Sequence, residues 1–244
     1  MRYLRLIPLF LISIILFAED MNSDDIYKYI KKTQAQFEKA NNYQVTMEIE
    51  LKIPGFRMPK KKYEVFFQQP DNVKIKSRGF GMLPKTGLFT SPRDNFDNLK
   101  NMHLINQGIE RGTVFIKGDV IIDSLKLKMP NEYAKLGFRP SVTVKIDTVN
   151  WVIHSIVTEL DTLKLVEINN SYDIFQSNYI MPTKSTVQYF VKDAKLSSWL
   201  KKDISSIVGQ SPISQKNDMV EGLISIIYKD YRINEGIDKN IFKN

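Results

Sequence analysis

The segment from Tyr43 to Ile53 constrains the fold of this chain more than any other stretch of its sequence. Every odd position in it is apolar and every even position is polar. This period of two predicts a strand with one buried and one solvated face, because successive side chains of a strand point to opposite sides of the sheet. At ~3.3 Å per residue the strand would extend ~36 Å, which suits a large and strongly curved antiparallel sheet.

Shorter copies of this pattern follow along the chain, and they predict consecutive antiparallel strands because no helical pattern alternates with them. A turn is expected at Gly118-Asp119, between Val114–Ile116 and Val120–Ile122. The strand Trp151–Leu160 is apolar at both odd and even positions, which implies cover on each side of the sheet. The other expected strands carry Tyr63–Phe67, Val73–Ile75, Val142–Ile146, Leu163–Ile168, Tyr172–Tyr179, Val187–Val191 and Leu223–Asn234.

Two helices are expected in the first half of the chain. The first begins at a cap, Asn22 or Ser23, and runs to about Ala40 with an apolar stripe on one face. The second is short, has Pro92 at its first position, and carries Phe96 and Leu99.

A further helix is expected between Asp193 and Gly209, within a helical insertion near residues 193–218. Its apolar side chains fall on one face at helical spacing. That face fits packing on the sheet, contact with a membrane surface, or a lid over an apolar cavity.

The N-terminus has the pattern of an export signal. Arg2 and Arg5 precede an uninterrupted run of apolar and small residues up to Ala18. That run is shorter than the ~20 residues that span a bilayer. We expect residues 1–18 to be a signal peptide cleaved after Ala18, which leaves one periplasmic domain over residues 19–244. A chain that keeps the signal and stays tethered to the membrane is the alternative.

The amino-acid composition limits the kinds of binding site and partner that the exported chain can have. It has no cysteine, so disulfides, thiolate metal sites and a lipid-modified cysteine are excluded. The net charge of +8 falls to +6 when Arg2 and Arg5 leave with the signal. In an exported protein this excess points to anionic lipid surfaces before nucleic acid, although on charge alone a solvated lysine-rich surface is the favoured interpretation.

The sequence carries no recognisable catalytic or metal-binding motif. His103 and His154 lack a partner four residues away or a nearby carboxylate. A glycine-rich phosphate loop, a nucleophile elbow and a calcium loop are also missing from the sequence. We predict no enzyme activity, no cofactor and no metal. A hydrolase whose carboxylates meet only in the fold is the less favoured interpretation.

The loop from Gly79 to Phe89 carries apolar side chains between glycines and prolines. Such side chains need a place to be buried. Together with the Met and aromatic residues of the strands, they suit a pocket for flexible acyl chains. Ordinary core packing is the alternative for each of them.

Three segments occur in an order found in a known family. The first is the amphipathic helix followed by strands at 43–53 and 63–77 that are broken at Gln69-Pro70. The second is the meander 144–172 followed by residues 179–184, and the third is the strand and turn 227–237 closing at Phe242. In this order they resemble the LolA-like family of periplasmic outer-membrane lipoprotein carriers.

The resemblance implies an α+β, mainly β fold: a strongly twisted antiparallel incomplete β-barrel, or half-barrel, with helices covering its concave apolar face. It also implies that this face binds acyl chains and that the helices move when cargo enters or leaves. One departure concerns the residue before Pro70. The typical carrier has an arginine there that helps to hold the lid, whereas this chain has Gln69.

The function predicted is a monomeric periplasmic carrier that binds the acyl chains of lipoproteins or lipids and shuttles them toward the outer membrane. An inner-membrane donor and an outer-membrane acceptor are the implied partners, and no nucleic acid is expected. The alternative is an envelope sensor or scaffold on the same fold, without transport. The candidate lipid-binding residues of the cavity or lid are Tyr43, Val45, Met47, Ile49, Leu51, Tyr63, Val65, Phe67, Phe80, Met82, Leu83, Trp151, Leu196, Trp199 and Leu200.

Overall fold

The computed structural model describes residues 24–53, 56–57, 59–77, 91–105, 111–121, 140–191 and 220–242. The expected signal peptide (1–18), the loop 79–89 and the helical insertion 193–218 lie outside these residues. Residues 24–38 form a helix, which confirms the first predicted helix. Within the described residues, no helix has the length and hydrophobicity needed to cross a membrane.

Strands make up most of the described chain, as the alternating patterns predict. The sequence predicts separate strands at Leu163–Ile168 and at Tyr172–Tyr179, but β9 runs without a break from Leu163 to Phe175. The strands are β1 (Asn42–Ile53), β2 (Phe56–Arg57), β3 (Lys61–Gln68), β4 (Asn72–Ser77), β5 (Leu99–Ile105), β6 (Thr113–Val120), β7 (Pro140–Asp147), β8 (Val152–Leu160), β9 (Leu163–Phe175), β10 (Tyr179–Val191) and β11 (Val220–Ile233). The 3-10 helices are η1 (Pro92–Asn95) and η2 (Lys239–Phe242).

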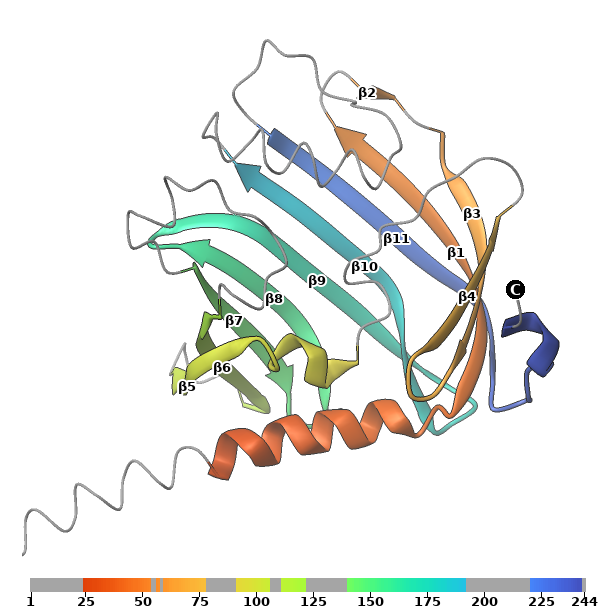
Figure 1. The fold of residues 1–244 in the computed structure, drawn as a ribbon, viewed down its shortest axis with the longest axis horizontal. Helices are drawn as coiled ribbons and strands as arrows, with labels where there is room; N and C mark the ends of the chain where they lie inside the picture. The colour runs from red at the N-terminus through yellow and green to blue at the C-terminus, as the bar shows by residue number, and fades with distance from the viewer. Residues whose placement is uncertain are drawn as a thin grey trace, which may run out of the picture.

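The strands form one antiparallel, strongly twisted sheet in the order β4-β3-β1-β11-β10-β9-β8-β7-β6-β5, with β2 paired to β1. Among the described strands, β4 and β5 are the two ends of this order and do not pair with each other. Figure 1 shows the resulting open, curved sheet with the N-terminal helix across one end of it. The predicted half-barrel fold is confirmed.

β1 shows why the alternating segment dominates the fold. Its odd positions point into the core, where Met47 is 0% exposed, and its even positions point outward. On the outer face, Glu48 lies 3.0 Å from the Lys62 ammonium of β3 and accepts a 2.9 Å bond from Lys229 of β11. These bonds, above all the one from Lys229, hold the pKa of Glu48 below its ordinary value.

Two buried clusters make up the core. The large cluster lies on β1, β3 and β9–β11 and contains Ala40, Tyr43, Val45, Met47, Ile49, Leu51, Tyr63, Val65, Phe67, Leu160, Leu165, Met181, Tyr189, Ile224, Ile226, Tyr228 and Ile233. The small cluster lies on β5–β8 and contains Ile26, Phe96, Leu99, Ile116, Val120, Val144, Ile146 and Ile153.

The N-terminal helix joins these two clusters. Ile26 belongs to the small cluster and Ile30 packs against it. Phe37 packs against the large cluster, with its ring 5.6 Å from that of Phe67. The positions 26, 30, 33, 37 and 40 recur at helical spacing, so one face of the helix contacts both halves of the sheet.

The turn predicted at Gly118-Asp119 is wrong, because β6 runs through both residues. Gly118 is needed for packing instead. A Cβ atom at this position would lie 3.1 Å from both Leu99 Cβ and Met102 Cγ on the neighbouring strand β5. Glycine inside a strand often marks such a close approach rather than a turn.

The second predicted helix is only partly right. Pro92 does occupy the first position, but the helix is the single 3-10 turn η1, which ends before Phe96. Leu99 begins β5, a strand that the sequence did not predict. Phe96 and Leu99 are both buried in the small cluster. Their apolar side chains therefore reflect burial in this cluster and not a shared helix face.

A β-bulge at His154 changes the interpretation of β8. Lys145 of β7 pairs with Ser155, but the next residue, Ile146, pairs with Ile153, so His154 is an extra residue in the ladder. The extra residue shifts the alternation by one. Ile153 and Ile156 therefore both face the small cluster. This explains much of why the strand Trp151–Leu160 has apolar residues at both odd and even positions.

Candidate functional site

A cavity of about 140 Å³ lies between the N-terminal helix and the sheet. An apolar cavity of about this size accommodates benzene, whereas a site for a drug-sized ligand measures roughly 300–1,000 Å³. It can therefore hold one short segment of a chain. On the helix and just after it, the described residues that line the cavity are Thr33, Gln36, Phe37 and Ala40. The other described lining residues are Tyr43, Pro92, Asn95, Trp151, Val152, Ile153, Ile156, Asn170, Tyr172, Ile180, Met181, Pro182, Ser185 and Tyr228.

The position of the cavity follows from the two core clusters. Ile153 and Ile156 border it on the side of the small cluster, and Tyr43 and Met181 border it on the side of the large cluster. The helix packs on both clusters and lines the cavity between them. Figure 1 shows the helix lying across one end of the sheet.

The helix contributes one polar group without a partner. Among the described residues, Nε2 of Gln36 is buried and makes no hydrogen bond. The neighbouring Thr33 is satisfied, because its hydroxyl donates a 2.8 Å bond to the Tyr29 carbonyl. A buried donor without an acceptor costs roughly 1–3 kcal/mol, so the Gln36 amide is an unfavourable feature of the described structure.

Trp151 connects the sheet to the first half of the helix. Its ring stacks on Tyr29 with the centroids 6.2 Å apart, and the Lys32 ammonium lies 4.2 Å from its ring centroid. Trp151 ends the turn before β8 and has a left-handed backbone with a φ of 56°. A non-glycine residue in this region costs about 1–3 kcal/mol, which these contacts help to offset.

A polar network lies along the sheet side of the cavity. The Ser185 hydroxyl donates a 2.7 Å bond to Oδ1 of Asn170, and Nδ2 of Asn170 donates to the Ile153 carbonyl at 3.1 Å. The Tyr172 hydroxyl donates to the same carbonyl at 2.9 Å, and that of Tyr228 donates to Ser185 at 3.3 Å. These side chains bridge β8 to β9 at a point where the strands no longer pair by backbone bonds.

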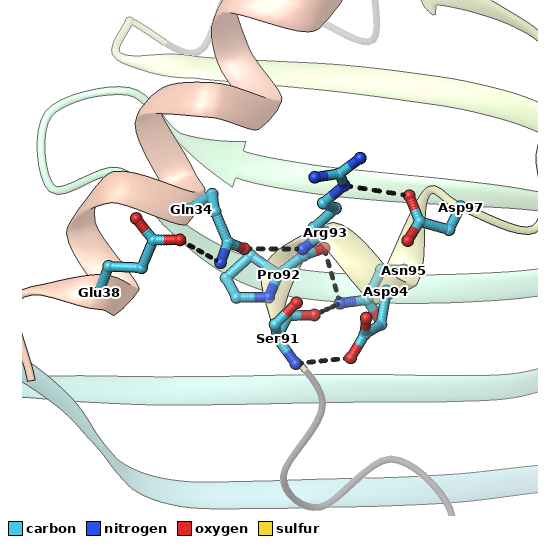
Figure 2. Close-up of polar contacts among 8 residues, drawn as sticks. All are labelled: Gln34, Glu38, Ser91, Pro92, Arg93, Asp94, Asn95 and Asp97. Atoms are coloured by element: carbon cyan, nitrogen blue, oxygen red, sulfur yellow. Dashed lines mark hydrogen bonds and ion pairs between the residues drawn. The ribbon is translucent and has the colours of Figure 1, made fainter. Parts of the chain in front are cut away.

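η1 supports the middle of the helix. Figure 2 shows Gln34 of the helix facing η1, where its Oε1 accepts a 3.2 Å bond from the Arg93 backbone N–H. Nε2 of Gln34 donates to Glu38 at 2.9 Å, which fixes its orientation. Asp94 accepts a 2.9 Å bond from the Ser91 N–H and so closes the η1 turn.

The C-terminal end of the helix is held by side chains from distant strands. Nδ2 of Asn234 donates to the Lys39 carbonyl at 3.0 Å, and Oδ1 of Asn234 accepts a 3.0 Å bond from the Asn42 N–H. Nε2 of Gln69 donates to the carbonyls of Phe37 and Ala40 at 3.4 and 3.3 Å. Gln69 thus contacts the helix end, at the position where the typical carrier has an arginine.

The structure separates the predicted site residues into three groups. Tyr43 and Trp151 line the cavity. A second group lies in the large cluster without lining the cavity, and consists of Val45, Met47, Ile49, Leu51, Tyr63, Val65 and Phe67. The third group lies outside the described residues, and consists of Phe80, Met82, Leu83, Leu196, Trp199 and Leu200.

The sequence analysis missed the polar members of the cavity wall. Thr33 and Gln36 share the helix face of Ile26 and Phe37, so the spacing of the apolar stripe contained a signal for them. Asn170 and Ser185 had no such signal, because they meet only through the pairing of β9 with β10, where they are directly opposite each other.

The fold brings a carboxylate to one of the two histidines. Nε2 of His154 lies 3.5 Å from Oδ2 of Asp147, so the fold does supply a nearby carboxylate. The two residues are seven apart in sequence and meet because the turn 148–151 folds β8 back on β7. In the described part of the chain, His, Cys, Asp and Glu form no group of three that could hold a metal ion.

Comparison by sequence finds no matching protein family and no matching characterised protein. Among solved structures, a DUF1329 family protein from Desulfovibrio piger is similar, with 6% identity, a TM-score of 0.50, and 89% of this chain and 96% of that chain covered. A LolA superfamily protein from Nitrosomonas europaea has 9% identity and a TM-score of 0.48 over 89% of this chain and 97% of that one. A domain described as an outer membrane lipoprotein-sorting protein, from Vibrio parahaemolyticus, has 11% identity and a TM-score of 0.46 over 88% of this chain and 95% of that one.

At these identities the likeness concerns the fold alone. The architecture implied by the sequence resemblance is nevertheless present in the chain itself: an open antiparallel sheet, an opening helix followed by β1 and β3, and the late strands β9 to β11 in order. In its fold, the chain is similar to the DUF1329 family protein.

Proposed function

We propose that the protein is a periplasmic carrier that binds the acyl chains of lipids or lipoproteins and shuttles them toward the outer membrane without catalysing a reaction. The observation that carries the proposal is the apolar cavity beneath a helix that spans two separate core clusters. Burying a chain there would be favourable by about 0.8 kcal/mol for each CH₂ removed from water. The export signal expected at residues 1–18 supports the periplasmic location.

The unpartnered Gln36 amide supports a lipid with a carbonyl group near its acyl chain. Gln36 lines the cavity, and its buried Nε2 atom has no acceptor among the described residues. An ester or amide carbonyl is a suitable acceptor, and both occur where acyl chains join a glycerol or a protein. Such a contact would orient the chain while the apolar wall supplies most of the affinity.

Entry of a whole acyl chain requires the cavity to enlarge, because about 140 Å³ holds only a short segment. The helix is suited to this movement. Its C-terminal end is fixed to Asn234 and Gln69 by hydrogen bonds, whereas its first half rests on Ile26 and on the contacts with Trp151. We propose that the helix pivots near residues 39–41 and lifts from Trp151 when cargo enters.

Filling the cavity tests this function. Ile180 lines the cavity, whereas Ile227 is 37% exposed and lies on the face of β11 opposite to Ile226 and Tyr228. We expect Ile180→Trp to weaken binding of a zwitterionic diacyl phospholipid at least about tenfold, because the larger ring occupies space that the chain needs. Ile227→Trp is the matched control and should bind as the unaltered protein does. Fluorescent-lipid displacement measures both.

The proposal fails if the two variants bind lipid equally well, or if the protein purified from its own envelope carries no acyl-chain ligand by native mass spectrometry. Thermal unfolding of each variant checks that the fold is retained.

One observation favours a second candidate, an envelope sensor or scaffold without transport. The large cluster fills much of the space beside the sheet, and Val45, Val65 and Phe67 are only 0–1% exposed. A well-packed face leaves little room for several acyl chains. Retention of a single protein partner after delipidation would support this candidate over the carrier.

A further inference from the structure

A second cavity, of about 600 Å³, lies on the outer face of strands β6 to β9. The strand register places this cavity on the face of the sheet opposite to the small cluster. Lys145 is opposite Ser155, and Ser155 is opposite Asn169, so these side chains form a row across three strands. The adjacent residues Val144 and Ile146 belong to the small cluster. The second cavity is therefore separated by the sheet from the apolar core.

The β-bulge in β8 builds one wall of this cavity. As the extra residue of the ladder, His154 is turned to the outer face beside Ser155, and both line the cavity. The ring is held from two sides, because Nδ1 lies 3.3 Å from the Asn170 carbonyl and Nε2 lies 3.5 Å from Asp147. A bulge that re-aims a side chain into a cavity is a feature associated with binding sites.

The charges around the cavity favour an anion. Arg111 and Lys145 line it, and both carry permanent positive charge at neutral pH. The single carboxylate there, Asp147, is already engaged: its Oδ1 accepts bonds from the Val149 and Asn150 N–H groups at 2.7 and 3.1 Å, and its Oδ2 accepts from the Asn150 amide at 2.9 Å. Hydrogen bonds thus engage both Asp147 oxygens, and the Lys145 ammonium lies 5.6 Å from the ring centroid of Phe115.

We propose that this cavity is a second binding site, and that it takes a phosphate-type oxyanion held by Arg111 and Lys145, with Ser155 as a further contact and the His154 ring beside it. Arg111 supplies the planar fork that matches such oxygens, and Lys145 supplies a point charge. The anion is either a free phosphate compound or the phosphate of a lipid headgroup at a membrane surface. Of the described residues, Asn170 lines both cavities, and the proposal does not rest on the function proposed for the first cavity.

Titration calorimetry with inorganic phosphate and glycerol 3-phosphate tests the free ligand, and co-sedimentation with phosphatidylglycerol or phosphatidylcholine vesicles tests the lipid. We expect Arg111→Gln and Lys145→Gln each to weaken binding roughly tenfold, as the loss of one charge-assisted hydrogen bond predicts. Lys184→Gln removes the same charge from an exposed position on β10 and should change nothing. The His154 ring resonance in the unaltered protein should shift on adding phosphate, and that of His103 should not.

Phosphate binding that depends on Arg111 and Lys145 supports a free ligand. Binding only to anionic vesicles, with the same dependence, supports the headgroup. The proposal is overturned if neither ligand binds, if Lys184→Gln weakens binding as much as the two site variants, or if the His154 resonance is unmoved. Because the acyl-chain assay uses a zwitterionic lipid and Ile180→Trp, either proposal can fail without the other.

Discussion

At the scale of single residues, buried tyrosines distinguish the core around the cavity. Tyr43, Tyr172 and Tyr228 line it, and Tyr231 packs on Tyr43 with the rings 6.0 Å apart. Burial is the main cause that raises the pKa of all four phenols, and for Tyr43, Tyr172 and Tyr231 the proximity of other phenols adds to it. The structure therefore keeps these hydroxyls protonated and available as hydrogen-bond donors, as Tyr231 shows by donating to the Pro182 carbonyl at 2.8 Å.

These raised pKa values predict a loss of stability in alkali. An unfolded phenol ionises near pH 10, whereas the buried phenols stay protonated, so unfolding releases protons above that pH. The stabilisation is complete below about pH 10 and declines as the pH rises further, by up to about 1.4 kcal/mol per pH unit for each phenol. Urea unfolding at a series of pH values measures the slope.

Tyr231→Phe should make that slope shallower, since one buried phenol is removed. The prediction is contradicted if tyrosinate absorbance develops for every tyrosine with one midpoint near pH 10 while the protein remains folded.

At the scale of elements, the N-terminal helix is attached differently at its two ends. Hydrogen bonds from Asn234 and Gln69 hold the last turn, and Asn234 has a left-handed backbone with a φ of 57° that places its amide between Lys39 and Asn42. The first half is attached through side-chain packing, chiefly of Ile26 and of Tyr29 on Trp151. Packing contacts can be broken and remade by a small rotation, so under the proposed lid movement this half is the one expected to move.

Trp151→Ala should free the first half of the helix. It removes the stacking on Tyr29 and the interaction with Lys32, and together these predict a loss of about 2 kcal/mol in the free energy of unfolding. Tyr27→Ala is the control, because Tyr27 is on the same helix but is 64% exposed, and it should change stability by less than about 0.5 kcal/mol. Denaturant unfolding measures both, and equal losses would show that Trp151 has no special role.

At the scale of the whole molecule, one continuous sheet carries two core clusters, and the helix is the element that packs on both. The large cluster is built on β1 and β11, which pair along nearly their full lengths. The small cluster is built on β6 to β8, nearer the end of the sheet order. The space between the clusters is the place where the described fold can accept a ligand with the least rearrangement of strands.

Hydrogen exchange should reveal this division. We expect the slowest amides in β1 and β11, because these strands are paired on both sides and carry the large cluster. Loading with an acyl-chain ligand should accelerate exchange in residues 24–34 and leave β1 and β11 unchanged, because only the helix moves. Unchanged exchange throughout residues 24–38 on loading would argue against the helix as a moving lid.

Much of this fold was predictable from local patterns. The alternation in Tyr43–Ile53 predicted β1 and its buried face, and the apolar stripe predicted the helix that begins before Ile26. These predictions succeed because strand and helix periods repeat over a few neighbouring residues. At Gly118 the same approach failed, because the reason for a glycine lies on β5, more than ten residues away.

The sequence by itself determined that the chain forms a curved antiparallel sheet with one apolar face and an amphipathic helix to cover it. Only the tertiary structure decided that Val45 and Met47 pack in a filled cluster while Tyr43 borders a cavity, and that His154 meets Asp147 beside Lys145. The physical reason is that a local period fixes which side a residue faces, whereas strand register and a single bulged residue fix what it faces there.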